Sequence, residues 1–473
     1  MKFKRIVFCF VILMISGFFY GDSNRGLETG KIVSRVVTLA DPTQSYALYL
    51  PSNYSREKNW PLLFTFDPGA RSEIPLTLFK NVAEKYGYIV VCSNNLKNGP
   101  WQSILKAMKA VWSDVLNRFS IDFDRIYTTG FSGGARAAAA FPHITGARAA
   151  GIIACGAGLP PAVKANQVKP AFYHGVVGVE DYNYKEMIRL NRELEAAGVD
   201  HFIEVFNGDH GWPPENICHE AIEGMELRAM KKGLRPKDRD LIETVFRRSL
   251  EKVRNLEATL NPYFARNYCL ALEALFQDLI ETGPIRDKIT QLEASRELNK
   301  FQKEEDKRNR TELEFLRRFL AVFTRLKNNE QKRADLKKIS GELNLNNLVR
   351  EASRTKNPYQ GAMARRLLDE LVSKGNQEGN HYLKKRDFIR ARIFFGIAAR
   401  ANATGIRAYY NLACVHALQN DKKSAIRYLN IMIENAQKKR YRDFSFLMRE
   451  KDLDSLRKEK EFIELIEKLG LKE

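Results

Sequence analysis

The stretch Ile126-Tyr127-Thr128-Thr129-Gly130-Phe131-Ser132-Gly133-Gly134-Ala135-Arg136 decides the fold of this chain. Residues 125–129 predict a short buried strand, and the alanine-rich run 135–141 predicts the start of a helix packed closely against a sheet. Gly130 and Gly134 fit the pattern Gly-x-Ser-x-Gly, in which small residues let the backbone turn sharply beside the serine. We therefore expect Ser132 on a tight strand-to-helix turn, where hydrolases expose a nucleophile.

Strand-like and helix-like segments alternate around this turn, from about residue 31 to residue 234. Helices are predicted near 78–86 and 103–119, and the apolar strands are predicted at 36–39, 46–50, 61–66, 88–92, 125–129, 151–154, 171–176 and 201–206. This alternation is typical of an α/β fold, in which helices cover both faces of a parallel sheet.

The pattern changes after Gly233 to long helices with almost no strand signal. Residues 238–331 predict amphipathic helices, broken at Asn261-Pro262 and at Gly283-Pro284. Further on, one set of positions recurs 34 residues later: Gly379, Tyr382, Ala391, Phe395 and Ala398 correspond to Ala413, His416, Ala425, Leu429 and Met432. Residues 377–435 therefore resemble tetratricopeptide repeats, although His416 replaces the preferred aromatic residue, and the resemblance implies a possible protein partner.

The first residues have the layout of a secretory signal, with Lys2, Lys4 and Arg5 before an apolar run at 6–20. We expect a secreted or periplasmic protein, and an uncleaved membrane anchor is the alternative. The expected organisation is a signal peptide at 1–21, an α/β-hydrolase domain at 22–234, a helical region at 235–375, and repeats with a capping tail at 376–473.

The formal charge of +20 is concentrated in the second half, where residues from Gly233 onward hold 51 Lys and Arg against 35 Asp and Glu. Clustered cations attract nucleic acid or anionic membranes. Here the charges recur on amphipathic helices, so we interpret them as solvated faces and expect no nucleic-acid partner. The five cysteines after Cys9 lack close pairs and metal-ligand spacing, so neither a disulfide framework nor a metal site is expected.

A serine hydroxyl needs a base to become a nucleophile, and a carboxylate usually orients that base. In α/β-hydrolases the acid and the histidine follow the serine, on loops after the last strands. His210 alone among the seven histidines lies downstream of Ser132 in a glycine-bounded loop after a predicted strand. Asp181 follows the preceding strand and is the predicted acid, with Glu180 as a rival. Asp209 adjoins His210 and is expected to cap the turn.

The oxyanion of a tetrahedral intermediate needs preoriented donors, usually the amide after the nucleophile and one from an earlier loop. Gly133 supplies the first predicted amide, and Gly69 or Ala70 supplies the second, after the strand 61–66. An ordinary Asp-Pro-Gly turn is the alternative for that loop. Trp101 and Trp212 are predicted to line a substrate pocket, with core packing as the alternative.

Ser132 in its Gly130–Gly134 turn, Asp181, and especially His210-Gly211-Trp212-Pro213-Pro214 make residues 36–233 resemble extracellular esterases of the polyhydroxybutyrate-depolymerase and feruloyl-esterase type. The resemblance implies a carboxylic-ester hydrolase that uses an acyl-enzyme and no cofactor, acting on a small or polymeric ester. A non-catalytic interaction protein with a hydrolase-like scaffold and a serine peptidase remain the alternatives.

Overall fold

The computed structural model describes residues 27–259, 262–328, 335–354 and 358–471. The predicted signal peptide at 1–21 lies outside the described residues. Within the described ranges, no helix is both long enough and apolar enough to cross a bilayer.

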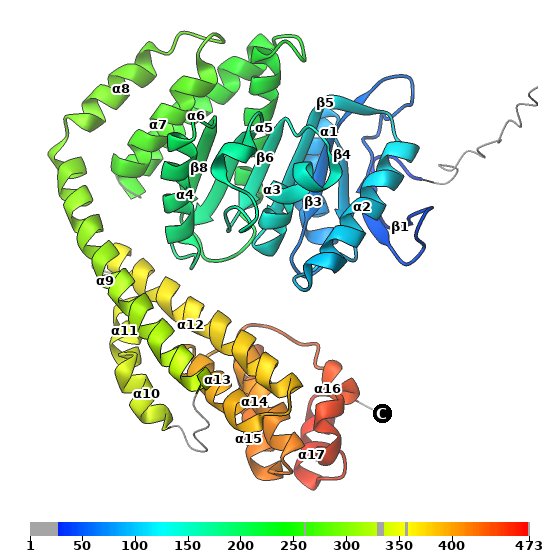
Figure 1. Cartoon of the computed structure of the whole chain (residues 1–473), viewed down its shortest axis with the longest axis vertical. Coiled ribbons are helices and arrows are strands. Elements are labelled where there is room, and N and C mark those ends of the chain that lie inside the picture. Colours follow the sequence, from blue (N-terminus) through cyan, green and yellow to red (C-terminus); the bar gives the residue numbers. More distant parts are fainter. Residues whose placement is uncertain (1–26, 260–261, 329–334, 355–357, 472–473) are drawn as a thin grey trace, which may run out of the picture.

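An eight-stranded mixed sheet forms the upper part of the molecule in Figure 1. Its order is β1-β2-β4-β3-β5-β6-β7-β8. The strands are β1 (Ile32–Val37), β2 (Ser45–Tyr49), β3 (Trp60–Phe66), β4 (Ile89–Ser93), β5 (Ile121–Phe131), β6 (Gly151–Cys155), β7 (Phe172–Gly178) and β8 (His201–Phe206). Each strand predicted from periodicity overlaps an observed strand, although β1 begins and ends before the predicted range 36–39. The expectation of a wholly parallel sheet needs correction, because β2 pairs antiparallel with both β1 and β4, whereas β3 to β8 are parallel.

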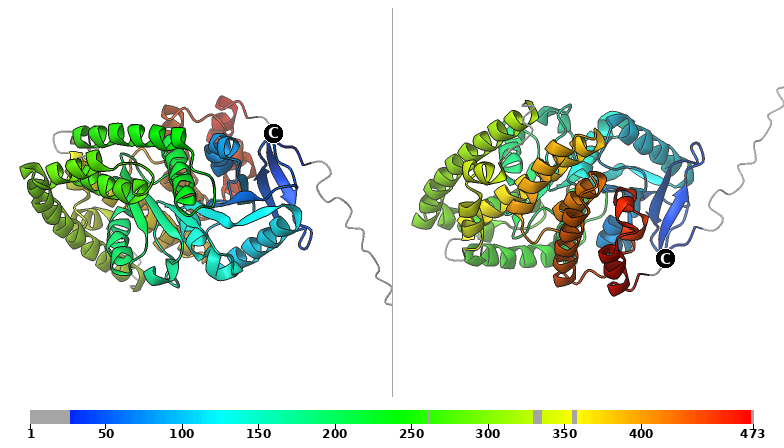
Figure 2. Two further views of the ribbon diagram at one scale, coloured as in Figure 1. Left: turned by 90° about the horizontal axis from the view of Figure 1, so that it is seen from above. Right: turned by 90° about the horizontal axis from the view of Figure 1, so that it is seen from below.

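Helices cover both faces of this sheet (Figure 2). They include α1 (Glu73–Tyr86), α2 (Trp101–Arg118), α3 (Gly133–Thr145), α4 (Tyr184–Ala196) and α5 (Glu215–Lys231). On one face, α1 and α5 bury apolar side chains such as Phe79 and Ile222. On the other face, α2, α3 and α4 bury Val111, Phe141 and Met187. β3, β4, β6 and β7 are buried along their whole length, and cover on both faces explains why these strands are mostly apolar.

Three helices continue from the sheet part without a break in packing: α6 (Arg239–Thr259), α7 (Pro262–Phe276) and α8 (Gly283–Glu293). Val245, Phe276 and Ile285 belong to the same hydrophobic cluster as the sheet residues. The chain does turn at Gly233, which has a φ of 71°. The boundary predicted at residue 234 therefore separates two kinds of secondary structure but does not separate two hydrophobic cores.

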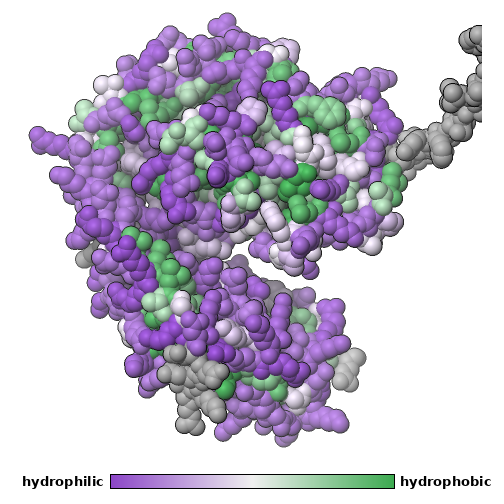
Figure 3. All heavy atoms as spheres, viewed as in Figure 1, coloured by the Kyte–Doolittle hydropathy of each residue, from purple (hydrophilic) through white to green (hydrophobic). Residues whose placement is uncertain are grey.

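The lower part of Figure 1 is helical and begins with the long helix α9 (Arg296–Asn328), which runs down from the sheet part. The following elements are α10 (Leu336–Glu342), α11 (Leu345–Ala352), α12 (Pro358–Lys384), α13 (Phe388–Ala401), α14 (Arg407–Leu418), α15 (Lys422–Lys438), α16 (Phe446–Arg449), the 3-10 helix η2 (Lys451–Leu456) and α17 (Lys460–Lys468). The space-filling view shows a mostly hydrophilic surface with a hollow between the two parts (Figure 3).

The sequence repeat falls on two packed helix pairs, α12 with α13 and α14 with α15. Its positions Ala391, Phe395, Ala413 and Leu429 are fully buried. Residues 375 and 376, between which a domain boundary was predicted, both lie inside the continuous helix α12. The likeness to tetratricopeptide repeats stays a prediction from the sequence pattern.

Candidate active site

Ser132 lies between β5 and α3 in a strained backbone conformation, with φ 53° and ψ −119°. A residue other than glycine adopts positive φ rarely, and such strain is concentrated at functional sites. The turn also forces other chain segments very close together. A Cβ added to Gly130 would lie 2.2 Å from the Gly134 carbonyl oxygen, and one added to Gly134 would lie 2.1 Å from the Phe66 carbonyl oxygen. The two glycines of the motif are thus required by close backbone contact.

Three side chains from distant parts of the sequence meet at the carboxyl ends of β5, β7 and β8. His210 Nε2 lies 3.0 Å from Ser132 Oγ, and His210 Nδ1 lies 2.8 Å from Asp181 Oδ1. With Asp181 ionised, Nδ1–H donates to the carboxylate and Nε2 is left to accept the serine proton. This is the geometry that activates a serine.

The acid end of this chain of hydrogen bonds is buried, whereas His210 and Ser132 are partly exposed. Asp181 is 1% exposed, and burial raises the pKa of its carboxyl group, while its hydrogen bond and attraction to His210 oppose that rise. The carboxylate oxygen Oδ1 also accepts the Asn183 amide at 2.7 Å. The imidazole of His210 lies against two rings, with centroid distances of 4.7 Å to Phe131 and 4.0 Å to Tyr182.

The neighbouring carboxylates are oriented differently. Glu180, the rival for the acid role, forms an ion pair with Arg365 at 2.8 Å, so the geometry places Asp181 rather than Glu180 beside His210. The backbone carbonyl of Asp209 accepts the Gly211 amide at 3.0 Å, which fits a role in the turn. Among the other histidines, His174 lies inside β7, is buried, and contacts Glu204 at 3.0 Å.

The Gly133 amide opens helix α3, where a first-turn N–H has no partner inside the helix. Gly69 and Ala70 are placed differently from the prediction. The Gly69 amide donates to Asp67 Oδ1 at 2.8 Å, and the Ala70 amide donates to the Asp67 carbonyl at 3.1 Å. Both bonds belong to a turn of the Asp-Pro-Gly type, which was the alternative interpretation of this loop. Neither amide can donate to an oxyanion without losing its hydrogen bond to Asp67.

The exposed side chain of Asn98 lies over Gly133 and was not singled out from the sequence. A Cβ added to Gly133 would lie only 1.8 Å from Asn98 Oδ1 and 3.2 Å from Nδ2. The backbone amide of Asn98 donates to the Pro68 carbonyl at 2.8 Å, and this bond holds the Asn98 loop against the turn after β3. A side-chain amide thus lies beside the amide expected to hold the oxyanion.

The two tryptophans predicted to line a pocket differ in their surroundings. Trp212 packs on Phe131 and Phe79, and its indole N–H donates to Asp67 Oδ2 at 2.9 Å. Burial acts to raise the pKa of Asp67, but hydrogen bonds from Arg71 and Trp212 bring it below its ordinary value. These contacts show packing of the kind given as the alternative for Trp212, and its contact with substrate stays a prediction. Trp101 begins α2 with 39% of its surface exposed, and its contact with substrate stays a prediction.

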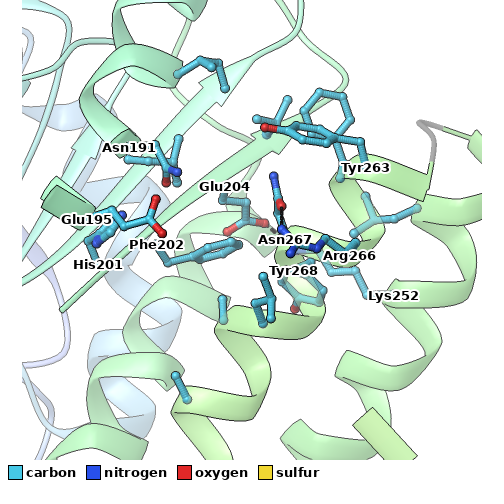
Figure 4. A pocket seen from close by; sticks show the side chains of 18 residues that line it. Asn191, Glu195, His201, Phe202, Glu204, Lys252, Tyr263, Arg266, Asn267 and Tyr268 are labelled. Carbon is cyan, nitrogen blue, oxygen red and sulfur yellow. Dashed lines mark hydrogen bonds and ion pairs between the residues drawn. The ribbon is translucent and has the colours of Figure 1, made fainter. Parts of the chain in front are cut away.

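A cavity of about 250 Å³ lies elsewhere, between α4, β8, α6 and α7 (Figure 4). Among its charged groups, Lys252 pairs with Glu204 at 2.5 Å, and Arg266 pairs with Glu293 at 2.7 Å. None of the residues predicted to act in catalysis lines it. We place the chemistry at the serine turn, because a strained nucleophile with an oriented base is found there.

The sheet order, the strained serine and its hydrogen-bonded histidine and aspartate define an α/β-hydrolase fold followed by a helical part. No protein-family model matches this chain, and no curated protein matches it. Solved structures similar to it include a ferulic acid esterase, with 15% identity, a TM-score of 0.34, and coverage of 41% of this chain and 94% of that one. An S-formylglutathione hydrolase from Staphylococcus aureus also gives 15% identity and a TM-score of 0.34, over 41% and 99% of the two chains. Esterase 2 from Thermogutta terrifontis gives 14% identity and a TM-score of 0.31, over 40% and 88%.

Proposed function

We propose that this protein is a serine hydrolase that cleaves carboxylic esters through an acyl-enzyme on Ser132. The observation that carries the proposal is the unbroken hydrogen-bond chain from Ser132 Oγ through His210 to Asp181, with distances of 3.0 and 2.8 Å. It is supported by the positive φ of Ser132, which costs free energy and is retained where a nucleophile must be exposed.

In the first half of the reaction, His210 Nε2 accepts the Ser132 proton while Oγ attacks the ester carbonyl carbon. The protonated imidazole then gives that proton to the departing alcohol, which leaves the acyl group on Ser132. In the second half, His210 removes a proton from water as the water attacks the acyl carbon. The bond between the acyl carbon and Ser132 Oγ then breaks, the imidazolium returns the proton to Oγ, and the acid is released. Asp181 keeps Nδ1 protonated and stabilises the imidazolium throughout.

The negative oxygen formed in each half needs two donors. The Gly133 amide is the proposed first donor. For the second we propose the side-chain amide of Asn98, because the Gly69 and Ala70 amides already donate to Asp67. Rotation of the Asn98 side-chain amide about its Cβ–Cγ bond exchanges the positions of Oδ1 and Nδ2. This rotation places the donor Nδ2 beside Gly133, where Oδ1 lies now.

Steady-state hydrolysis of short-chain nitrophenyl esters tests the proposal, with peptide substrates assayed beside them. The wild-type protein is expected to cleave esters, and Ser132→Ala is expected to lower kcat by at least about 10⁴-fold while the protein stays folded. Preference for peptides would identify a peptidase instead. Wild-type protein inactive on both classes would favour the non-catalytic scaffold and overturn the proposal.

Export of the enzyme is also proposed, because Lys2, Lys4, Arg5 and the apolar run after them have the composition of a secretory signal. Mass measurement of the protein recovered from cells tests this, since removal of the signal leaves a new N-terminus near residue 22. An intact N-terminus in a membrane fraction would indicate the anchored form.

A further inference from the structure

The loop that carries Asp181, from Gly178 to Tyr184, is fastened on its inner side to the loop that carries His210. The Val179 amide donates to the Phe206 carbonyl at 2.9 Å, and the Glu180 amide donates to the Gly208 carbonyl at 2.9 Å. These bonds set the depth of the acid loop relative to the end of β8. They do not involve the outer side of the loop, where the Val179 carbonyl accepts a hydrogen bond from another part of the chain.

The helical part supplies that partner through Arg366 of α12. Arg366 Nη1 donates to the Val179 carbonyl at 2.6 Å, across 187 positions of sequence. The same guanidinium donates to both carboxylate oxygens of Glu312 in α9, at 3.2 and 2.7 Å, and lies 4.6 Å from the ring centre of Tyr184. Arg366 and Glu312 are 6% and 4% exposed. A buried charge pair is costly unless fully hydrogen-bonded, so this contact fixes one arrangement of the two parts.

Further contacts from the same two helices flank Asp181 on both sides. Arg365 pairs with Glu180 at 2.8 Å, just before the acid. Lys185, just after the loop, pairs with Glu305 of α9 at 2.9 Å. Burial raises the pKa of Tyr182, and its hydrogen bonds with the hydroxyls of Ser373 in α12 and of Ser132 oppose that rise. Helix α12 therefore contacts residues on both sides of the acid, through Arg365 on Glu180 and through Arg366 over the ring of Tyr184.

We propose that the helical part belongs to the catalytic machinery, with Arg366 as a positioning residue that holds the Asp181 loop against His210. This inference rests on the proposed hydrolase function and concerns the same site. An arginine can hold the loop and the Glu312 carboxylate at once because its planar guanidinium presents several donors in fixed directions. A shift of the acid loop by about 1 Å misaligns the imidazole and can lower the rate of the chemical step by about 100-fold.

The test compares the full-length wild-type protein with the double variant Arg366→Met/Glu312→Gln, which removes the buried pair without leaving an isolated charge. Arg325→Met is the matched control, because Arg325 forms an ion pair of the same kind with Glu342, at 2.6 Å, on an exposed surface of the helical part. The double variant is expected to lose about 10- to 100-fold in kcat on a nitrophenyl ester, with KM changed less than about twofold. Arg325→Met is expected to keep wild-type kinetics.

Two further measurements separate positioning from loss of folding. Amide hydrogen exchange in peptides covering residues 178–184 should increase in the double variant, while exchange in β3 to β6 stays as in the wild type. Arg366→Lys keeps a charge for Glu312 but cannot bridge to Val179 in the same way, so it should fold and still lose kcat. A folded double variant with wild-type kcat and unchanged exchange in the acid loop would overturn the inference. An inactive wild-type protein would instead overturn the proposed function.

Discussion

At the scale of single residues, the candidate site depends on three side chains that the sequence separates widely. Ser132, Asp181 and His210 could be predicted because each follows an apolar strand, and parallel strands place their carboxyl ends at one edge of a sheet. Asn98 and Tyr182 could not be predicted in the same way. Asn98 sits in an exposed loop with no pattern of its own, and its nearness to Gly133 depends on how two loops pack.

Replacement of the acid tests the part that Asp181 plays. Asp181→Asn should fold, because the two side chains have nearly the same shape, but kcat should fall by about 10³- to 10⁴-fold. An amide in place of the carboxylate favours the tautomer of His210 that cannot accept the serine proton. Steady-state kinetics on a nitrophenyl ester measure the effect, with Asp209→Asn as the neighbouring control. Equal loss in both variants would count against Asp181 as the acid.

Removal of the proposed second oxyanion donor gives a separate prediction. Asn98→Ala should lower kcat by about 10²- to 10³-fold with little change in KM, because the lost hydrogen bond forms only when negative charge develops. The exposed neighbour Lys97 offers the control Lys97→Ala, which should keep wild-type kinetics. Unchanged kcat in Asn98→Ala would contradict this role for Asn98 and would favour an amide of the loop after β3 as the second donor.

At the scale of elements, the strands of the sheet could be predicted from apolar runs and from the turn residues between them. Their direction could not, because an apolar strand has the same pattern in a parallel and an antiparallel pair, and β2 is antiparallel to both neighbours. The loops after β3 and β8 are joined by a contact that only the fold creates. There Trp212 donates to Asp67, which is buried.

Loss of that contact should weaken the sheet part measurably. Trp212→Phe keeps an aromatic ring against Phe131 and Phe79 but removes the hydrogen bond to the Asp67 carboxylate, so the free energy of unfolding should fall by about 1–3 kcal/mol. Urea unfolding followed by circular dichroism measures it. The exposed Trp101 provides the same substitution as a control, with an expected change within about 0.5 kcal/mol. Equal stability of the two variants would refute the proposed tie between the loops.

At the scale of the whole molecule, two parts that differ in composition meet at the edge of the sheet that carries the candidate site. The helices of the second half could be predicted, but their docking could not, since Arg366 and the Val179 carbonyl are 187 positions apart and no local pattern connects them. The continuity of α12 across residues 375 and 376, where the repeat region was predicted to begin, could not be predicted either. Composition reports local structure, whereas a shared hydrophobic cluster and buried ion pairs decide which segments fold as one unit.

Asp369 of α12 gives this docking a pH dependence. Burial raises the pKa of its carboxyl from 3.8 to about 6, helped by repulsion from Asp209 and Glu180 and opposed by His210. The folded protein thus holds this proton more tightly than the unfolded chain does, so the stability contributed by this group falls as pH rises from about 4 to 6 and stays lower above that range.

Asp369→Asn removes that ionisation and should raise Tm at pH 8, by the equivalent of at most about 3 kcal/mol, reduced because the carboxyl is partly exposed to solvent. Near pH 4 the variant and the wild type should have almost the same Tm. Thermal unfolding at both pH values measures the difference. A Tm gain that is as large at pH 4 as at pH 8 would show that the effect does not come from this proton.

The most direct test of the central claim is to locate a covalent adduct after treating the full-length protein with an organophosphonate probe. Peptide mass spectrometry should find the probe on Ser132, with labelling abolished in Ser132→Ala and strongly slowed in His210→Ala, because the hydroxyl reacts only when the imidazole takes its proton. Wild-type protein that stays unlabelled, or Ser132→Ala protein that is labelled to the same extent, would contradict the account.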